Sequence, residues 1–207
     1  MAASKVDIST IRSKITAARS EGSAVALVGI DGRGGSGKST LARQLADGWS
    51  GVTVIEMDDF YLPRNQRPDD TSKPGANFDR YRLISEVLEP LRAGRHGKYQ
   101  RYDWNRDELA EWHEVDPAGL VIVEGVYSTS SLLRDYFDFK AWVDASYEVR
   151  LARGVARDGE EMRSTWVDKW MPTEDVYVAL EEPQRFADLI VDGSGVNGDA
   201  NIFTLSD

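Results

Sequence analysis

The chain has 207 residues, and its 25 lysines and arginines against 35 aspartates and glutamates give a formal net charge of −10. This length suits a single domain, 1–207, and the negative charge argues against a nucleic acid polymer or an anionic membrane as the main partner. Cysteine is absent, which excludes a disulfide framework and a cysteine nucleophile. No apolar run approaches the ~20 residues of a membrane span, and residues 1–21 lack the apolar stretch of a secretion signal, so we expect a cytoplasmic protein.

Predicted strands alternate with predicted helices along the chain. Apolar residues at helical spacing, Ile8, Ile11 and Ile15, predict a leading helix within residues 1–22. Short apolar runs predict five strands, at 24–30, 52–57, 120–123, 139–143 and 189–191. Helical patterns separate them, from residue 38 onward and at 81–91, 131–136, 147–157 and 165–182. This order predicts an α/β fold, with a five-stranded parallel sheet and helices on both faces.

A long excursion separates the second and third predicted strands. Within residues 94–116, the segments 99–104 and 112–115 could pair as a small antiparallel β-ribbon over the sheet. An insertion of this length is where a substrate pocket can be built.

Residues 32–39 match the pattern G-x-x-x-x-G-K-[ST], between a predicted buried strand and a predicted amphipathic helix. Glycines let the backbone curl so that its N–H groups surround a phosphate, and the helix N-terminus adds its dipole. We expect Lys38 to bridge the β- and γ-phosphates of ATP and the Ser39 hydroxyl to bind Mg²⁺. The predicted nucleotide contacts are Gly32, Gly34, Gly35, Ser36, Gly37, Lys38, Ser39 and Thr40. The motif in this context predicts a three-layer P-loop NTPase fold.

Other segments narrow the class of P-loop protein. The chain contains no N/T-K-x-D segment and no L-S-G-G-Q segment, which argues against a GTPase switch and a transporter ATPase. Asp58 and Asp59 follow the second predicted strand, and ligands of open parallel sheets sit beyond the carboxyl ends of strands. Asp58 is therefore expected beside the phosphates, where it could accept the proton of a substrate hydroxyl or hold water on Mg²⁺. The alternative is a solvated turn that precedes Pro63.

From about residue 25 to residue 192 the chain resembles the uridine kinase-like branch of the uridine kinase and phosphoribulokinase family of P-loop kinases. The resemblance rests on the order and spacing of the phosphate loop, M-D-D-F-Y at 57–61, N-F-D at 77–79, Y-D-W at 102–104, V-I-V-E-G at 121–125, V-D at 143–144, R-L-A-R at 150–153 leading to R-D at 157–158, and A-D-L-I-V at 187–191.

This resemblance implies an ATP- and Mg²⁺-dependent transferase that phosphorylates a hydroxyl of a small-molecule acceptor. A nucleoside such as uridine or cytidine is the leading candidate. A kinase of another hydroxylated metabolite, such as pantothenate or a sugar, and a non-catalytic ATP-binding sensor are the alternatives. A homo-oligomer remains open.

The resemblance also implies roles for individual residues. Asp58 is expected to be the general base, and Glu124 to act near Mg²⁺ together with Ser39 and Asp58. Arg153 and Arg157 lie four residues apart, hence on one helix face. The family likeness makes this helix the start of a lid, at 147–165, whose arginines neutralise charge during transfer. The adenine pocket is expected near the turn at 193–198.

On the acceptor side, Asp79 is expected to bind substrate hydroxyls, with Tyr61 beside it. Tyr102 and Trp104 match aromatic positions that hold the base in uridine kinases, and packing of the inserted ribbon is the alternative interpretation for both.

Two positions depart from the family pattern. Asp107 stands where uridine kinases have a histidine that contacts the pyrimidine, and Gly154 stands where they have an arginine that contacts substrate. His113 lies nearby but is more typical of a surface residue. The sequence therefore predicts conserved donor chemistry with a changed acceptor site.

Overall fold

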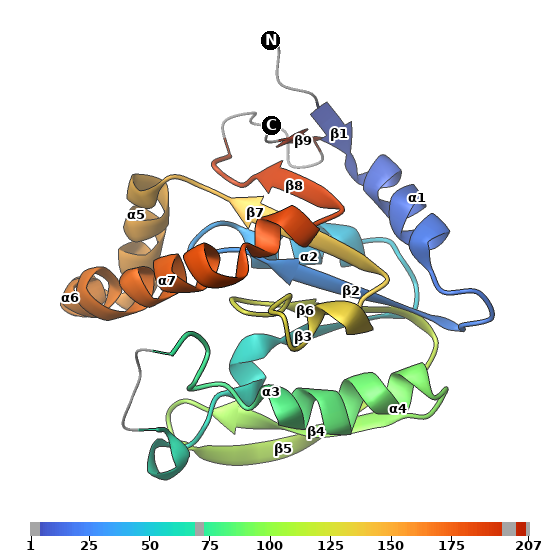
Figure 1. The fold of residues 1–207 in the computed structure, drawn as a ribbon, viewed down its shortest axis with the longest axis horizontal. Helices are drawn as coiled ribbons and strands as arrows, with labels where there is room; N and C mark the ends of the chain where they lie inside the picture. Colours follow the sequence, from blue (N-terminus) through green and yellow to red (C-terminus); the bar gives the residue numbers. More distant parts are fainter. Residues whose placement is uncertain (1–4, 69–72, 196–201, 206–207) are drawn as a thin grey trace.

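A computed structural model describes residues 5–68, 73–195 and 202–205 of the chain. Its main sheet has the strand order β1-β9-β8-β7-β2-β6-β3 (Figure 1). The strands are β1 Lys5–Asp7, β2 Val25–Asp31, β3 Val52–Glu56, β6 Gly119–Glu124, β7 Phe139–Asp144, β8 Leu189–Asp192 and β9 Ile202–Leu205. Strand β2 pairs in parallel with both β6 and β7, so the strand that leads into the phosphate loop lies near the middle of the sheet.

The five predicted strands form the parallel part of this sheet, which confirms the predicted fold class. Two strands were not predicted: β9 pairs antiparallel with β8, and β1 pairs antiparallel with β9. Strand β1 has three residues and β9 has four, which is too few to show an alternating pattern in the sequence.

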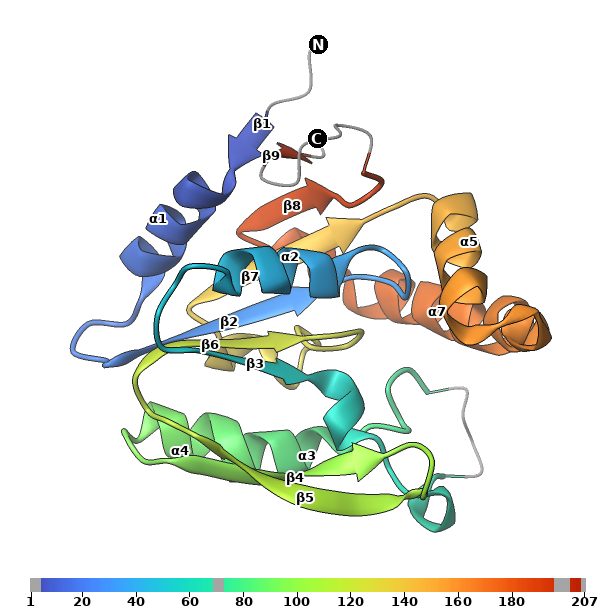
Figure 2. The ribbon, with the colours of Figure 1, turned by 180° about the vertical axis from the view of Figure 1, so that it is seen from behind.

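Helices cover both faces of the sheet. They are α1 Ile8–Ala18, α2 Lys38–Ala46, α3 Arg80–Leu83, α4 Glu89–Arg92, α5 Tyr147–Asp158, α6 Arg163–Thr165 and α7 Met171–Glu181. Helix α2 lies across one face (Figure 2), where α1 and α2 share an apolar core with β2, β6, β7 and β8. The path from α3 to α4 packs on the opposite face through a second core, and α7 crosses in front of β7 and β8 in Figure 1.

Local sequence explains where these helices begin and where the prediction failed. The leading helix begins after Asp7, whose carboxylate accepts a hydrogen bond of 2.7 Å from the Thr10 N–H, and it buries the three predicted isoleucines. π-helical turns at Ile84–Leu88 and Trp166–Trp170 join α3 to α4 and α6 to α7. The predicted helix at 131–136 is wrong: turns end there in a 3-10 helix at Arg134–Tyr136, because six residues are too few to sustain an α-helix.

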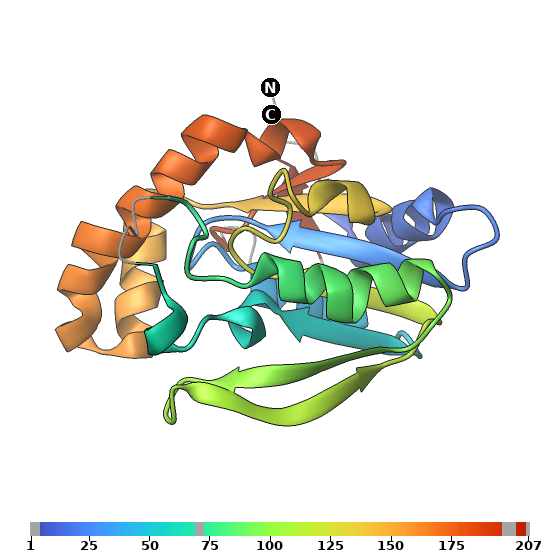
Figure 3. The same cartoon turned by 60° about the horizontal axis from the view of Figure 1, so that its bottom comes forward.

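The inserted ribbon is present. Strands β4 Gly97–Asp103 and β5 Glu108–Val115 pair antiparallel and lie beneath α3 and α4 (Figure 3). Tyr99 and Val115 of the ribbon belong to the same core as these helices. The Tyr99 hydroxyl also donates a 2.9 Å hydrogen bond to Asp59, which fixes the ribbon to the turn after β3. None of the helices among the described residues has the length and hydropathy needed to cross a bilayer.

Candidate active site

The phosphate loop connects β2 to α2, and its glycines are required by its backbone. Gly32, Gly35 and Gly37 have φ angles of 148°, 75° and 111°, a region that side chains disfavour. A Cβ at Gly32 would also lie 2.2 Å from the carbonyl oxygen of Val143 on β7. Helix α2 begins at Lys38, directly after the loop. The sequence motif therefore corresponds to a tightly packed loop that ends at a helix N-terminus.

Lys38 and Arg153 contact the loop from different elements. The Lys38 ammonium donates a 3.0 Å hydrogen bond to the Arg33 carbonyl. Arg153 of α5 donates to the carbonyls of Gly35 at 3.2 Å and Gly193 at 2.8 Å. These contacts favour a supporting role for Arg153, and its expected role in neutralising transferred charge stays a prediction.

The acidic residues expected near Mg²⁺ follow neighbouring parallel strands. Glu124 ends β6 and is buried, and Asp58 lies in the 3-10 turn after β3, where it stays accessible to solvent. Surrounding protein atoms displace part of the water around both carboxyls, which raises their pKa even though solvent still reaches Asp58, and the charges of Lys38 and Arg157 oppose that rise. The Ser39 hydroxyl hydrogen-bonds Glu124, which lowers the pKa of that carboxyl in turn. Two acids, a hydroxyl and two cations are thus within electrostatic reach of one another.

This donor set fits a Mg²⁺ ion that is bound together with phosphates. The described part of the chain contains no cluster of three or more His, Cys, Asp or Glu side chains that could hold a metal alone. Magnesium usually takes only one or two carboxylates from the protein and fills its remaining positions with water and substrate phosphates. The pair formed by Ser39 and Glu124 is of this kind.

Arg157 lies at the end of α5 with its side chain 68% exposed. Its Nε and Nη2 atoms donate to the two oxygens of Asp158 at 2.7 and 3.0 Å. These hydrogen bonds raise the pKa of Arg157, and the charges of Asp58 and Glu124 act in the same direction. Arg157 is therefore positively charged and interacts electrostatically with Asp58 and Glu124.

The acceptor side is an aromatic cluster. The ring of Tyr61 lies 4.4 Å from that of Trp104, 4.9 Å from that of Phe78 and 5.7 Å from that of Tyr102, centroid to centroid. Tyr102 is 2% exposed and Trp104 is 50% exposed. Burial of Tyr102 supports the packing interpretation for that ring, whereas Trp104 offers surface on which a ligand could stack.

Asp107 is joined to this cluster through the hydroxyl of Tyr102. The Tyr102 hydroxyl donates to Asp107 at 2.6 Å, and Arg67 donates to both of them, at 2.7 and 3.0 Å. The hydrogen bond from Tyr102 lowers the pKa of Asp107. Asp79 caps α3 by accepting the Arg82 N–H at 3.0 Å. Asp107, which departs from the family pattern, therefore has a structural partner in Tyr102 of the ribbon.

Sequence reasoning missed two buried acids that contact the phosphate loop. Asp31, the last residue of β2, is fully buried. Glu174 of α7 accepts the Gly34 N–H at 3.1 Å and pairs with Arg150 at 3.3 Å. The place of Asp31 at the end of an apolar run, beside the motif, was a usable signal. Glu174 lies in an ordinary helical pattern and gave none.

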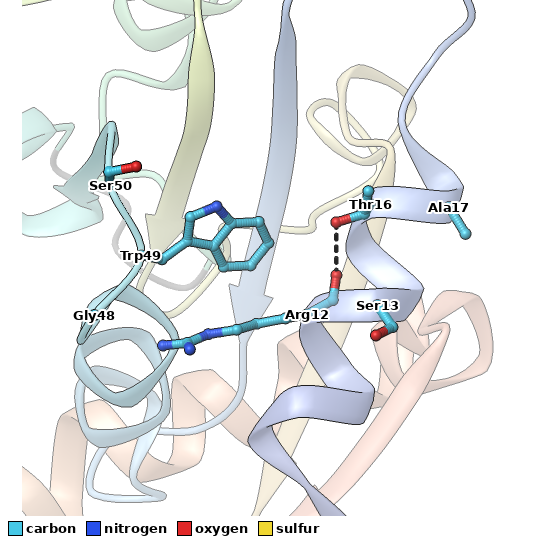
Figure 4. Close-up of a pocket in the computed structure, with 7 residues that line it drawn as sticks. All are labelled: Arg12, Ser13, Thr16, Ala17, Gly48, Trp49 and Ser50. Atoms are coloured by element: carbon cyan, nitrogen blue, oxygen red, sulfur yellow. Dashed lines mark hydrogen bonds between the residues drawn. The ribbon is translucent and has the colours of Figure 1, made fainter.

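The described part of the chain also contains a hollow away from this site. Arg12, Ser13, Thr16, Ala17, Gly48, Trp49 and Ser50 line it between α1 and the end of α2 (Figure 4). Arg12 lies 5.6 Å from the ring centroid of Trp49 and donates to the Leu45 carbonyl at 3.1 Å. Helix α2 has nine residues and therefore separates the hollow from the phosphate loop by about 13 Å. The expected adenine pocket at 193–198 lies partly outside the described residues.

Known proteins are similar to this chain in sequence and in fold. The model of the phosphoribulokinase / uridine kinase family matches residues 27–193. Uridine kinases from Clostridium perfringens and Leuconostoc citreum are 31% and 30% identical, covering 82% and 83% of this chain and 88% and 89% of theirs.

Solved structures that share the fold include the following two. One is of a possible uridine kinase from Bacillus stearothermophilus, with a TM-score of 0.67, 24% identity and coverage of 88% of this chain and 96% of the other. The second is of a putative fructose transport system kinase from Silicibacter, also with a TM-score of 0.67, at 21% identity and coverage of 85% and 96%. The chain belongs to the phosphoribulokinase and uridine kinase family of P-loop kinases.

Proposed function

We propose that this protein transfers the γ-phosphoryl group of ATP to a hydroxyl of a small metabolite, with a nucleoside such as uridine or cytidine as the leading acceptor. The observation that carries the proposal is the grouping of Asp58 and Glu124 with Lys38 and Arg157 at the phosphate loop. The names of the curated relatives support a nucleoside acceptor. The half-exposed Trp104 beside Tyr61 supplies aromatic surface for a base.

In the proposed reaction the acceptor oxygen forms a bond to the γ-phosphorus while the bond from that phosphorus to the β–γ bridging oxygen breaks. ADP leaves with the electron pair of that bond, and Asp58 accepts the proton of the acceptor hydroxyl. Lys38 and Arg157 neutralise the charge on the transferred group. Ser39, Glu124 and Asp58 would hold Mg²⁺, which when bound neutralises phosphate charge. Asp79 would bind a second acceptor hydroxyl.

The test measures ADP formation with a panel of nucleosides, sugars and vitamins. Asp58→Asn should lower kcat on the true acceptor by ~10²–10⁴-fold, because general-base catalysis contributes about that much. Asp59→Asn is the matched control, since Asp59 belongs to the same turn but hydrogen-bonds Tyr99 of the ribbon. Wild-type turnover by Asp58→Asn would show that Asp58 is not the general base.

The panel also separates the alternatives. If no nucleoside is phosphorylated but a sugar or pantothenate is, the protein is still a kinase and only the assignment of its acceptor changes. ATP binding without turnover of any compound would favour a sensor. Unchanged ATP affinity in Lys38→Ala would contradict binding at the phosphate loop itself.

A further inference from the structure

Gly154 has a neighbour that accounts for its lack of a side chain. A Cβ built on Gly154 would lie 2.4 Å from Cε2 of Trp166 and 2.5 Å from its Cζ2. Such contacts are too short to exist, so the indole occupies the space into which any side chain at Gly154 would project. Trp166 is 2% exposed and opens the π-helical turn Trp166–Trp170, a kind of turn that often occurs at functional sites.

The same indole reaches the phosphate loop. A Cβ built on Gly34 would lie 2.8 Å from Cζ3 and 2.9 Å from Cη2 of Trp166. One edge of the ring therefore lies against α5 and another against the loop. Because both contacts are closer than a methyl group allows, Trp166 sets the spacing between the lid helix and the phosphate loop.

The indole N–H of Trp166 also makes a hydrogen bond. Trp166 Nε1 donates a 3.0 Å hydrogen bond to Oδ2 of Asp158. Asp158 in turn accepts both Nε and Nη2 of Arg157, whose guanidinium carbon lies 5.8 Å from the centroid of the Trp166 ring. A guanidinium has five N–H donors, so this bidentate contact occupies two and leaves three for a ligand.

We propose that Trp166 is a positioning residue that holds Arg157, through Asp158, in the orientation required for phosphoryl transfer. The inference rests on the proposed function, since it gives Arg157 its role there. An ion pair whose arginine is exposed, such as Arg157 with Asp158, orients its partners only weakly by itself. The buried indole N–H fixes the carboxylate, and the fixed carboxylate orients the guanidinium. Trp166 thus occupies the space beside Gly154 and orients Arg157 through Asp158.

The experiment is a double-mutant cycle on the full chain. Trp166→Phe keeps an aromatic ring and removes the N–H, and it should lower kcat about 10-fold with the KM for ATP changed less than about 3-fold, since small misplacements of a catalytic group reduce kcat. Arg157→Ala should lower kcat further. The double variant should be no slower than Arg157→Ala alone, because the indole acts only through the arginine.

Trp112→Phe is the matched control, because Trp112 is exposed on the ribbon and has the same indole N–H. It should keep the wild-type kcat. Asp158→Asn tests whether Trp166 orients Arg157 through Asp158, and it leaves the indole ring in place, in case Trp166→Phe fails to fold. Its loss of kcat should likewise disappear in the Arg157→Ala background.

Two results would overturn the inference while the wild type remains an active kinase. One is a wild-type kcat in both Trp166→Phe and Asp158→Asn. The other is multiplicative losses in the cycle, which would mean that Trp166 and Arg157 act independently. Failure of the proposed function would look different: the wild type would then transfer no phosphoryl group to any acceptor. In that case the cycle is measured as affinity for a non-hydrolysable ATP analogue, and additivity there would again overturn the inference.

Discussion

Asp31 is a buried acid that accepts five hydrogen bonds beside the phosphate loop. Its Oδ1 accepts the N–H groups of Gly32 at 2.7 Å and Tyr127 at 3.1 Å. Its Oδ2 accepts the N–H of Thr129 at 2.9 Å, the hydroxyl of Thr129 at 3.0 Å and the hydroxyl of Tyr177 at 2.7 Å. This carboxylate therefore joins the phosphate loop, the segment after Glu124 and helix α7.

Asp31→Asn tests how much this junction contributes. An amide has one oxygen where the carboxylate has two. The two hydroxyls can rotate, but the three backbone N–H groups cannot. In one amide orientation the Thr129 N–H faces the NH₂ group, and in the other the N–H groups of Gly32 and Tyr127 do. Each buried donor left without an acceptor costs ~1–3 kcal/mol. Removing a charge whose pKa burial raises offsets part of this, so we expect a net loss of ~2 kcal/mol.

Urea unfolding measures this loss directly. A loss of ~2 kcal/mol in a chain of 207 residues corresponds to a fall in Tm of about 4–8 °C. Tyr177→Phe should cost only about 1 kcal/mol, because it deletes one hydroxyl donor and leaves the carboxylate with four. Asp116→Asn, at an exposed pair with His96, should stay within ~0.5 kcal/mol of the wild type. If Asp31→Asn matched that exposed control, the reasoning about fixed donors would be refuted.

Three further changes test separate parts of the structure. Burial alone would raise the pKa of Asp138, but the hydrogen bond from the Leu27 N–H and the contact with Arg92 hold it below its usual value. Its contribution is present above pH ~4 and is lost as the pH falls further, so Asp138→Asn should flatten the acid limb of stability, measured as Tm against pH. Gly32→Ala should abolish ATP binding in calorimetry, because its Cβ would meet a β7 carbonyl at 2.2 Å. Arg153→Ala should weaken ATP binding several-fold more than it lowers kcat if the arginine supports the loop, and an isolated loss of kcat would contradict this.

The sequence predicted the elements that carry strong local patterns. The five parallel strands and the leading helix follow from apolar periodicity, and the phosphate loop follows from glycines whose backbone angles only that residue adopts readily. Asp58 could be placed beside the phosphates because ligands of open parallel sheets lie beyond the carboxyl ends of the strands, whereas the place of Glu124 near Mg²⁺ was implied by the family resemblance. These inferences needed no knowledge of distant contacts.

Other parts of the site depend on contacts between distant segments. Glu174 reaches the Gly34 N–H across 140 residues of sequence, and no local pattern marks it. Gly154 looked like the loss of a functional arginine, whereas the structure shows a glycine that makes room for the Trp166 ring. Asp107 looked like the loss of a base-reading histidine and is instead bound to Tyr102 and Arg67.

The two ion pairs beside the phosphate loop differ in what a bound triphosphate could change. In the pair of Arg150 with Glu174 both side chains are buried. Separating a buried pair costs ~3–5 kcal/mol, so Arg150 should remain with Glu174 and support the loop. In the pair of Arg157 with Asp158 the arginine is 68% exposed, and such a pair contributes about 1 kcal/mol at most. The exposed Arg157 side chain can therefore offer its three remaining N–H donors to a phosphoryl group while Asp158 holds it. This difference in burial, rather than proximity alone, favours Arg157 as the arginine that acts in the transfer.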